Sequence, residues 1–134
     1  ALKTLATDLG MESSVVFCGR VSDEGLVDAY RRATVLASAS ISEGWGMTIT
    51  EAAACGTPAV VTDISGHRDA VRDGHSGLLA DGPADLAARL IEVVGDPDRR
   101  AALAAGGILM AARFDWDRTA TEAFRVLAST AGSR

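Results

Sequence analysis

Short apolar runs alternate with segments of helical periodicity along residues 14–80 of the chain. The apolar runs are typical of buried strands, and the segments between them carry helix formers, acidic starts and glycine or proline stops. We expect strands at residues 14–18, 34–38, 59–62 and 78–80, and helices at residues 22–33, 47–55 and 66–72. This alternation predicts a doubly wound parallel sheet, whose ligand site lies beyond the carboxyl ends of the strands.

Both ends of the chain have helical patterns. Residues 1–10 have the spacing of the last turns of a helix and end in a glycine. From Pro83 onward the strand pattern stops, and helices are predicted at residues 84–94, 97–112 and 115–131. A chain of 134 residues has room for one domain with a core. We therefore predict a single α/β domain over residues 1–134, with a Rossmann-like, doubly wound parallel sheet and a helical C-terminal tail.

The composition is that of a folded protein with an acidic surface. Hydrophobic residues make up 48% and charged residues 23% of the chain, the formal net charge is -5, and Lys3 is the one lysine. Repulsion from phosphate backbones disfavours non-specific nucleic-acid binding, and the scattered arginines form no polybasic membrane patch. No apolar run reaches the roughly 18 residues of a membrane-spanning helix. Cys18 and Cys55 are interpreted as reduced core thiols, which favours a cytoplasmic protein.

A glycine-rich loop follows the second predicted strand. The sequence Ser42-Glu-Gly-Trp-Gly-Met-Thr-Ile-Thr-Glu51 joins that strand to the next helix. Gly44 and Gly46 allow a tight turn and a close approach of the backbone to a ligand. The helix that begins near Met47 offers unpaired N–H groups and a partial positive charge to a phosphate. The loop therefore predicts an anion site at the ligand-binding edge of the sheet.

Two carboxylates, those of Glu43 and Glu51, flank this loop. Carboxylates accept charge-assisted hydrogen bonds from the vicinal hydroxyls of a sugar or a ribose. An acidic residue near the start of a helix can also serve only to balance the helix dipole. The loop itself can be an ordinary strand-to-helix turn, so spacing alone leaves both interpretations open.

Several motifs in fixed order resemble the retaining glycosyltransferase family 4, also called glycosyl transferases group 1. The string EGWGMTITEAAACGTPAVV at residues 43–61 is similar to the family signature of two glutamates separated by seven residues. Residues 17–21 resemble its base-side loop, residues 65–71 its glycine-containing turn, residues 73–79 its Asp-Gly-x-x-Gly segment and residues 114–116 its final aromatic landmark. The similarity extends from about residue 14 to residue 125 and implies the C-terminal, donor-binding domain of a GT-B fold.

The resemblance implies a role for each matching residue. Glu43 would be the catalytic residue that contacts the donor sugar near its anomeric carbon, and Glu51 would hold the ribose hydroxyls. The donor sugar and the diphosphate would be bound by Gly44, Trp45, Gly46, Met47 and Thr48, and the nucleobase would lie beside Arg20 and Val21. The donor would be a UDP- or GDP-hexose, transferred to an acceptor hydroxyl with retention of configuration, with no cofactor and no metal.

The resemblance also implies a second domain. Family members have two Rossmann-like domains, with acceptor contacts mainly on the first and donor contacts mainly on the second. This chain matches the second domain and is expected to be incomplete at its N-terminal end, where the family has an arginine and a lysine that grip the diphosphate. Lys3 does not match that pair. We therefore expect the fragment alone to be inactive, and nothing in it indicates membrane association.

Other interpretations remain open. The chain can be a non-catalytic module that binds nucleotide sugars, or part of a nucleotide-sugar epimerase of related fold. A dinucleotide-dependent oxidoreductase is disfavoured because Ile49 stands where its third glycine should fall. His67 and His75 can titrate near neutral pH. Both lack a carboxylate partner at an obvious spacing, so we expect them in solvent-exposed or capping positions.

Overall fold

The computed structural model describes residues 1–131, which contain a three-stranded parallel sheet in the order β1-β2-β3. The strands are β1 (Leu36–Ser38), β2 (Ala59–Thr62) and β3 (Gly77–Ala80). Helix α3 (Met47–Ala54) connects β1 to β2, and α4 (Ser65–Ala70) connects β2 to β3. Because each connection crosses over through a helix, the carboxyl ends of all three strands lie at one edge.

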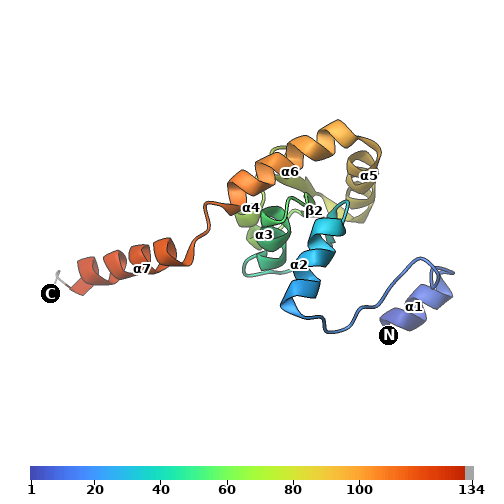
Figure 1. The fold of residues 1–134 in the computed structure, drawn as a ribbon, viewed down its shortest axis with the longest axis horizontal. Coiled ribbons are helices and arrows are strands. Elements are labelled where there is room, and N and C mark those ends of the chain that lie inside the picture. Colours follow the sequence, from blue (N-terminus) through green and yellow to red (C-terminus); the bar gives the residue numbers. More distant parts are fainter. Residues whose placement is uncertain (132–134) are drawn as a thin grey trace.

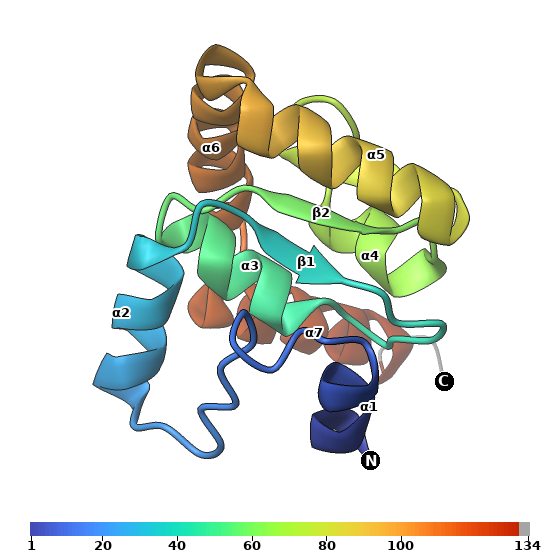
Figure 2. The same ribbon diagram turned by 90° about the vertical axis from the view of Figure 1, so that its right-hand side faces the viewer.

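The helices cover both faces of the sheet, as Figure 2 shows for α3 and α5 (Gly82–Gly95). Successive residues of β2 serve the two faces because strand side chains alternate. Ala59 and Val61 pack in a buried cluster with Ile49 of α3. Val60 packs on the other side in a cluster that also contains Leu78, Val93 of α5 and Leu103 of α6 (Pro97–Ala111). The predicted doubly wound α/β fold is therefore confirmed.

Local sequence signals set the helix starts. Ser22 caps α2 (Asp23–Arg32) by accepting a hydrogen bond of 3.2 Å from the N–H of Gly25. Asp96 caps α6 in the same way, with 2.9 Å to the N–H of Arg99. Side-chain oxygens at this position satisfy donors that have no partner inside the helix. The predicted helical tail is confirmed by α5, α6 and α7 (Trp116–Ala131), and α7 extends away from the sheet (Figure 1).

The strand predicted at residues 14–18 is absent, which corrects that prediction. This segment follows α1 (Leu2–Asp8) and runs as an extended connection to α2, away from the sheet (Figure 1). Val16 is 84% exposed, and Cys18 is a free, exposed thiol rather than a core residue. A strand requires hydrogen-bonded pairing with a neighbour. Within residues 1–131, β1 pairs with β2 and this segment joins no ladder.

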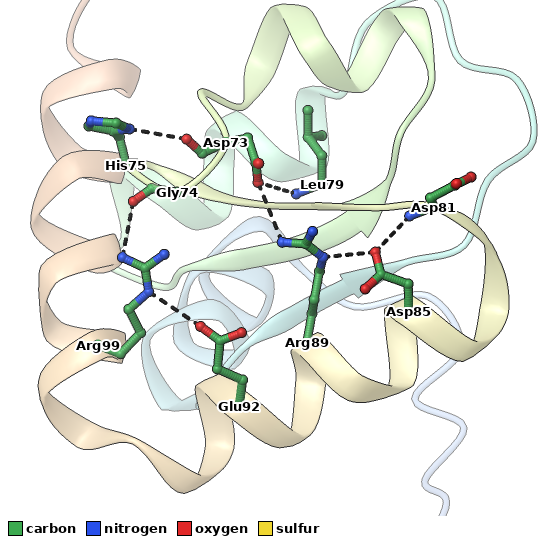
Figure 3. A network of polar contacts seen from close by, with 9 residues as sticks. All are labelled: Asp73, Gly74, His75, Leu79, Asp81, Asp85, Arg89, Glu92 and Arg99. Carbon is green, nitrogen blue, oxygen red and sulfur yellow. Dashed lines mark hydrogen bonds and ion pairs between the residues drawn. The ribbon is translucent and has the colours of Figure 1, made fainter.

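Polar contacts fasten the predicted turn at residues 73–77 to α5 and α6 (Figure 3). Oδ1 of Asp73 accepts a hydrogen bond of 2.9 Å from the N–H of Leu79 and lies 3.8 Å from Nη1 of Arg89 on α5. Arg99 of α6 donates to the carbonyl oxygen of Gly74 at 3.1 Å. The turn is thus held by the next two helices of the chain, α5 and α6.

Candidate functional site

The predicted glycine loop connects the carboxyl end of β1 to the start of α3. Gly46 is the N-cap of α3 and is buried; a Cβ there would lie 2.5 Å from Cδ1 of Ile49 and 3.4 Å from Cβ of Ala70. A side chain at this position would therefore have to displace the end of the buried Ile49 side chain. Within residues 1–131, the N–H of Thr48 in the first turn has no hydrogen-bond acceptor. The N-terminus of α3 thus keeps a donor and its partial positive charge for a ligand.

Glu43 lies in this loop with an exposed side chain. The hydroxyl of Ser40 donates a hydrogen bond of 2.9 Å to Oε1 of Glu43. The backbone of Glu43 rests on Gly66 at the start of α4, so closely that a Cβ on Gly66 would collide with the carbonyl oxygen of Glu43. The fold therefore fixes the backbone of this residue, and Ser40 gives its exposed carboxylate one hydrogen-bond donor.

Glu51 lies one turn into α3, where a buried tyrosine of α2 holds it. The phenol of Tyr30 donates a hydrogen bond of 3.0 Å to Oε2 of Glu51. Burial, followed by the hydrogen bond and the charge of Glu51, raises the pKa of Tyr30 to about 12. Tyr30 is therefore a fixed neutral donor, and Oε1 of Glu51 has no donor within the described part of the chain.

A hollow of about 530 Å³ lies beside Glu51. Trp45, Met47 and Thr50 line it from the loop and α3. The other side is lined by the segment before α7 and by the first turn of α7, at Phe114, Asp115, Trp116 and Thr119. Trp45 and Phe114 meet edge to face across the two sides, with ring centroids 4.9 Å apart. Aromatic rings and one carboxylate are the kinds of group that bind a nucleoside through stacking and its hydroxyls.

The structure does not bring every predicted site residue into that hollow. Trp45, Met47 and Glu51 line it, whereas Glu43, Gly44 and Thr48 belong to the adjacent loop and helix start and are exposed. Arg20 and Val21 are exposed on the connection between α1 and α2. Their predicted place beside the nucleobase stays a prediction.

The two histidines occupy different environments. His75 is exposed, as expected, with Nδ1 3.0 Å from the carbonyl oxygen of Asp73. His67 is 1% exposed, which corrects the expectation of a solvent-exposed or capping residue. Its Nδ1 lies 2.8 Å from the carbonyl oxygen of Thr62, and its Nε2 lies 3.5 Å from Oγ of Ser38. The position is buried because α4 packs directly on β2.

Sequence reasoning missed two groups that shape the site, Tyr30 and Ser40, and identified Phe114 only as part of a family landmark. Tyr30 and Glu51 are 21 residues apart, so no local spacing connects them. Ser40 stands three residues before Glu43, a spacing at which a serine often bonds to a neighbouring group. The spacing of Ser40 and Glu43 in the sequence was thus a signal for this contact. Residues 1–131 contain no group of three or more His, Cys, Asp or Glu side chains placed to hold a metal ion, and none of their helices is long and apolar enough to cross a membrane.

The fold and the site define a Rossmann-like α/β domain of the GT-B type, with a glycine loop and two held glutamates at the ligand-binding edge. The model of the glycosyl transferases group 1 family matches residues 1–110, and the chain belongs to this family. D-inositol 3-phosphate glycosyltransferases from Acidothermus cellulolyticus and Rhodococcus jostii are 44% and 42% identical to it over 120 and 122 residues. These matches cover 88% and 90% of this chain and 27% of each relative, so the chain spans about a quarter of their length.

Solved structures share the fold. The Anabaena protein HepE, solved in complex with UDP and glucose, has a TM-score of 0.84 and 27% identity, over 96% of this chain and 35% of that chain. Sucrose-phosphate synthase from Thermosynechococcus elongatus has a TM-score of 0.86 at 23% identity, over 99% of this chain and 34% of that chain. At 23% identity, the similarity to sucrose-phosphate synthase shows the fold alone.

Proposed function

We propose that this domain binds a nucleoside diphosphate sugar, a UDP- or GDP-hexose, as the donor-binding part of a retaining hexosyltransferase of family 4. The observation that carries the proposal is the arrangement of two carboxylates around one helix start. Glu43 precedes α3 and is held by Ser40, and Glu51 lies one turn into α3 and is held by Tyr30. An extended ligand with hydroxyls at both ends and a phosphate between them matches this arrangement.

Each part of the donor then has a partner. The ribose hydroxyls donate to Glu51 beside the hollow, and the sugar hydroxyls near the anomeric carbon donate to Glu43. The diphosphate lies at the N-terminus of α3, near the unpaired N–H of Thr48. The structure of HepE with UDP-glucose supports a uridine donor, since that relative shares the fold at 27% identity.

The chemical task is to stabilise the negative charge that grows on the departing diphosphate. The partial positive charge and free donors of a helix N-terminus meet this task without a metal ion or a cofactor. We propose that the acceptor is bound mainly by another domain of the full-length protein, and that this fragment alone is inactive. A cytoplasmic location stays a prediction from the sequence.

Calorimetric titration of the purified protein with UDP, GDP and ADP, and with UDP-glucose and GDP-glucose, tests the binding step. We expect one nucleotide to bind. Glu51→Gln should weaken it about 10- to 100-fold, because hydrogen bonds to charged groups contribute about 1.5–3 kcal/mol. The glutamine can still accept from Tyr30, and Glu12→Gln, at an exposed turn outside the site, serves as the control. A folded protein that binds none of these ligands would contradict the proposal.

Product analysis on the full-length protein tests the reaction. A glycoside whose anomeric configuration matches that of the donor supports retaining transfer, and Glu43→Gln should lower kcat. A nucleotide sugar with an inverted ring carbon would identify an epimerase instead. Donor binding with no turnover across a panel of acceptor alcohols would identify a non-catalytic binding module.

A further inference from the structure

A chain of polar side chains leads from the buried face of α4 to Glu43. The carbonyl oxygen of Thr62 can only accept a hydrogen bond, so Nδ1 of His67, 2.8 Å away, carries a hydrogen. The other ring nitrogen, Nε2, lies 3.5 Å from Oγ of Ser38 on β1. The buried ring thus packs at the inner end of the chain, beside the half-buried Ser38.

Two serine hydroxyls continue the chain outward. Oγ of Ser38 lies 3.2 Å from Oγ of Ser40, and the hydroxyl of Ser40 donates to Oε1 of Glu43 at 2.9 Å. An ionised carboxylate only accepts hydrogen bonds, so the single hydroxyl hydrogen of Ser40 points to Glu43. Ser38 then supplies the hydrogen between the two serines, so its 3.5 Å approach to the accepting Nε2 of His67 carries no hydrogen and is a packing contact. Hydroxyls aligned in one direction polarise each other and strengthen the last bond of the series.

The backbone around the chain is held as well. The hydroxyl of Thr62 on β2 donates to the carbonyl oxygen of Ser40. Gly66, next to His67 on α4, packs against the backbone of Glu43 with no space for a side chain. Contacts with β2 and α4 therefore hold the backbone around Glu43. The hydroxyl chain adds a contact to its carboxylate.

We propose that Ser38 and Ser40, with the buried His67 ring packed behind Ser38, form a positioning chain that holds the Glu43 carboxylate in the orientation that receives the donor sugar. This inference rests on the proposed function, in which Glu43 contacts that sugar. A free, exposed glutamate loses rotamer freedom when it is ordered on binding. A carboxylate that is already held by a hydroxyl donor avoids part of that loss. Ser40 and His67 act through Glu43 and need no contact with the donor.

The ligand-free test is an NMR measurement of the scalar couplings that report χ1 of Glu43. We expect a single rotamer in the wild-type protein, rotamer averaging in Ser40→Ala, and a single rotamer again in Ser40→Thr, which restores the hydroxyl. His67→Asn keeps an N–H near the position of Nδ1 for Thr62 and removes the Nε2 contact, so it should increase averaging without unfolding the protein. Ser13→Ala, at an exposed turn, is the control.

The binding test compares UDP-glucose with UDP, and GDP-glucose with GDP, on the same full-length protein. Ser40→Ala should weaken binding of the sugar nucleotide about tenfold and leave binding of the bare nucleotide unchanged, because only the sugar meets Glu43. His67→Asn should give a smaller loss, roughly threefold. Ser40→Ala should cause no further loss in a Glu43→Ala background, since Ser40 acts only through the Glu43 side chain.

The outcomes separate the two proposals. If Glu43→Gln weakens sugar-nucleotide binding while Ser40→Ala changes neither the couplings nor the affinity, the positioning chain is overturned and the proposed function stands. If Glu43→Gln has no effect on the sugar nucleotide, or if no nucleotide binds, the role of Glu43 in the proposed function is overturned, and the positioning role of the chain falls with it. Averaged χ1 couplings in the wild-type protein would overturn the positioning chain even without a ligand.

Discussion

The phenol of Tyr30 on α2 donates a hydrogen bond of 3.0 Å to Oε2 of Glu51 on α3. Tyr30 is 8% exposed, and the hydroxyl of Thr57 donates to its carbonyl oxygen, so both the ring and the backbone of the donor residue are fixed. A buried neutral donor of this kind directs one oxygen of the glutamate inward. Within residues 1–131, the other oxygen of Glu51 has no hydrogen-bond donor.

Tyr30→Phe should weaken nucleotide binding and lower the free energy of unfolding by about 1 kcal/mol, the usual net contribution of one hydrogen bond. The phenylalanine keeps the packing of the ring, so the change isolates the hydroxyl. Calorimetric titration with UDP or GDP and urea denaturation measure the two effects. Unchanged nucleotide affinity together with the expected loss of stability would show that the phenol does not orient Glu51.

The free energy of unfolding should fall at alkaline pH because the pKa of Tyr30 is raised in the folded protein. The pKa of Tyr30 is about 12 in the folded protein and near 10.0 in an unfolded chain. A raised pKa means that the unfolded state loses its proton first, so this contribution is complete below pH 10.0 and is lost as the pH rises to about 12. Denaturation at a series of pH values above about 9 should show this loss in the wild-type protein and a smaller one in Tyr30→Phe. Equal slopes would contradict the assignment.

Gly66→Ala should destabilise the protein and displace the loop that carries Glu43. The added Cβ would collide with the carbonyl oxygen of Glu43, and overpacking of this kind costs about 1–3 kcal/mol. Gly95→Ala, near the end of α5, is the matched control because nothing lies within 4 Å of the added Cβ. The free energies of unfolding and the affinities for UDP-glucose of the two variants check the prediction. Equal stability of both variants would mean that α4 does not support the loop.

Acid should weaken the polar contacts of Asp85 in the first turns of α5. The guanidinium of Arg89, which donates to Asp85 at 2.8 Å, lowers the pKa of that carboxyl below 3.8, and the N–H of Asp81 adds to the effect (Figure 3). A lowered pKa gives stability that is present above pH 3.8 and is lost as the pH falls through the folded value. Arg89→Gln should therefore lose less stability than the wild type as the pH falls below 3.8. Arg31→Gln, at an exposed position of α2, should behave as the wild type.

The sequence was sufficient to predict most of the elements because their signals are local. The cap at Ser22, the proline and aspartate at the start of α6, and the apolar run of β2 each act within a few residues. The place of the glycine loop between β1 and α3 follows from the same signals. The roles of Glu43 and Glu51 in binding a donor rest on the family resemblance and remain proposals.

Only the tertiary structure decided which groups meet across the fold. Residues 14–18 have the composition of a strand, but a strand forms only where its backbone finds a pairing partner, and this segment has none within residues 1–131. His67 stands in a short polar segment, yet the packing of α4 on β2 buries it. The contacts of Tyr30 with Glu51 and of Trp45 with Phe114 join residues that are distant in the sequence. Such contacts depend on how whole elements pack, and periodicity within one segment carries no information about its neighbours in space.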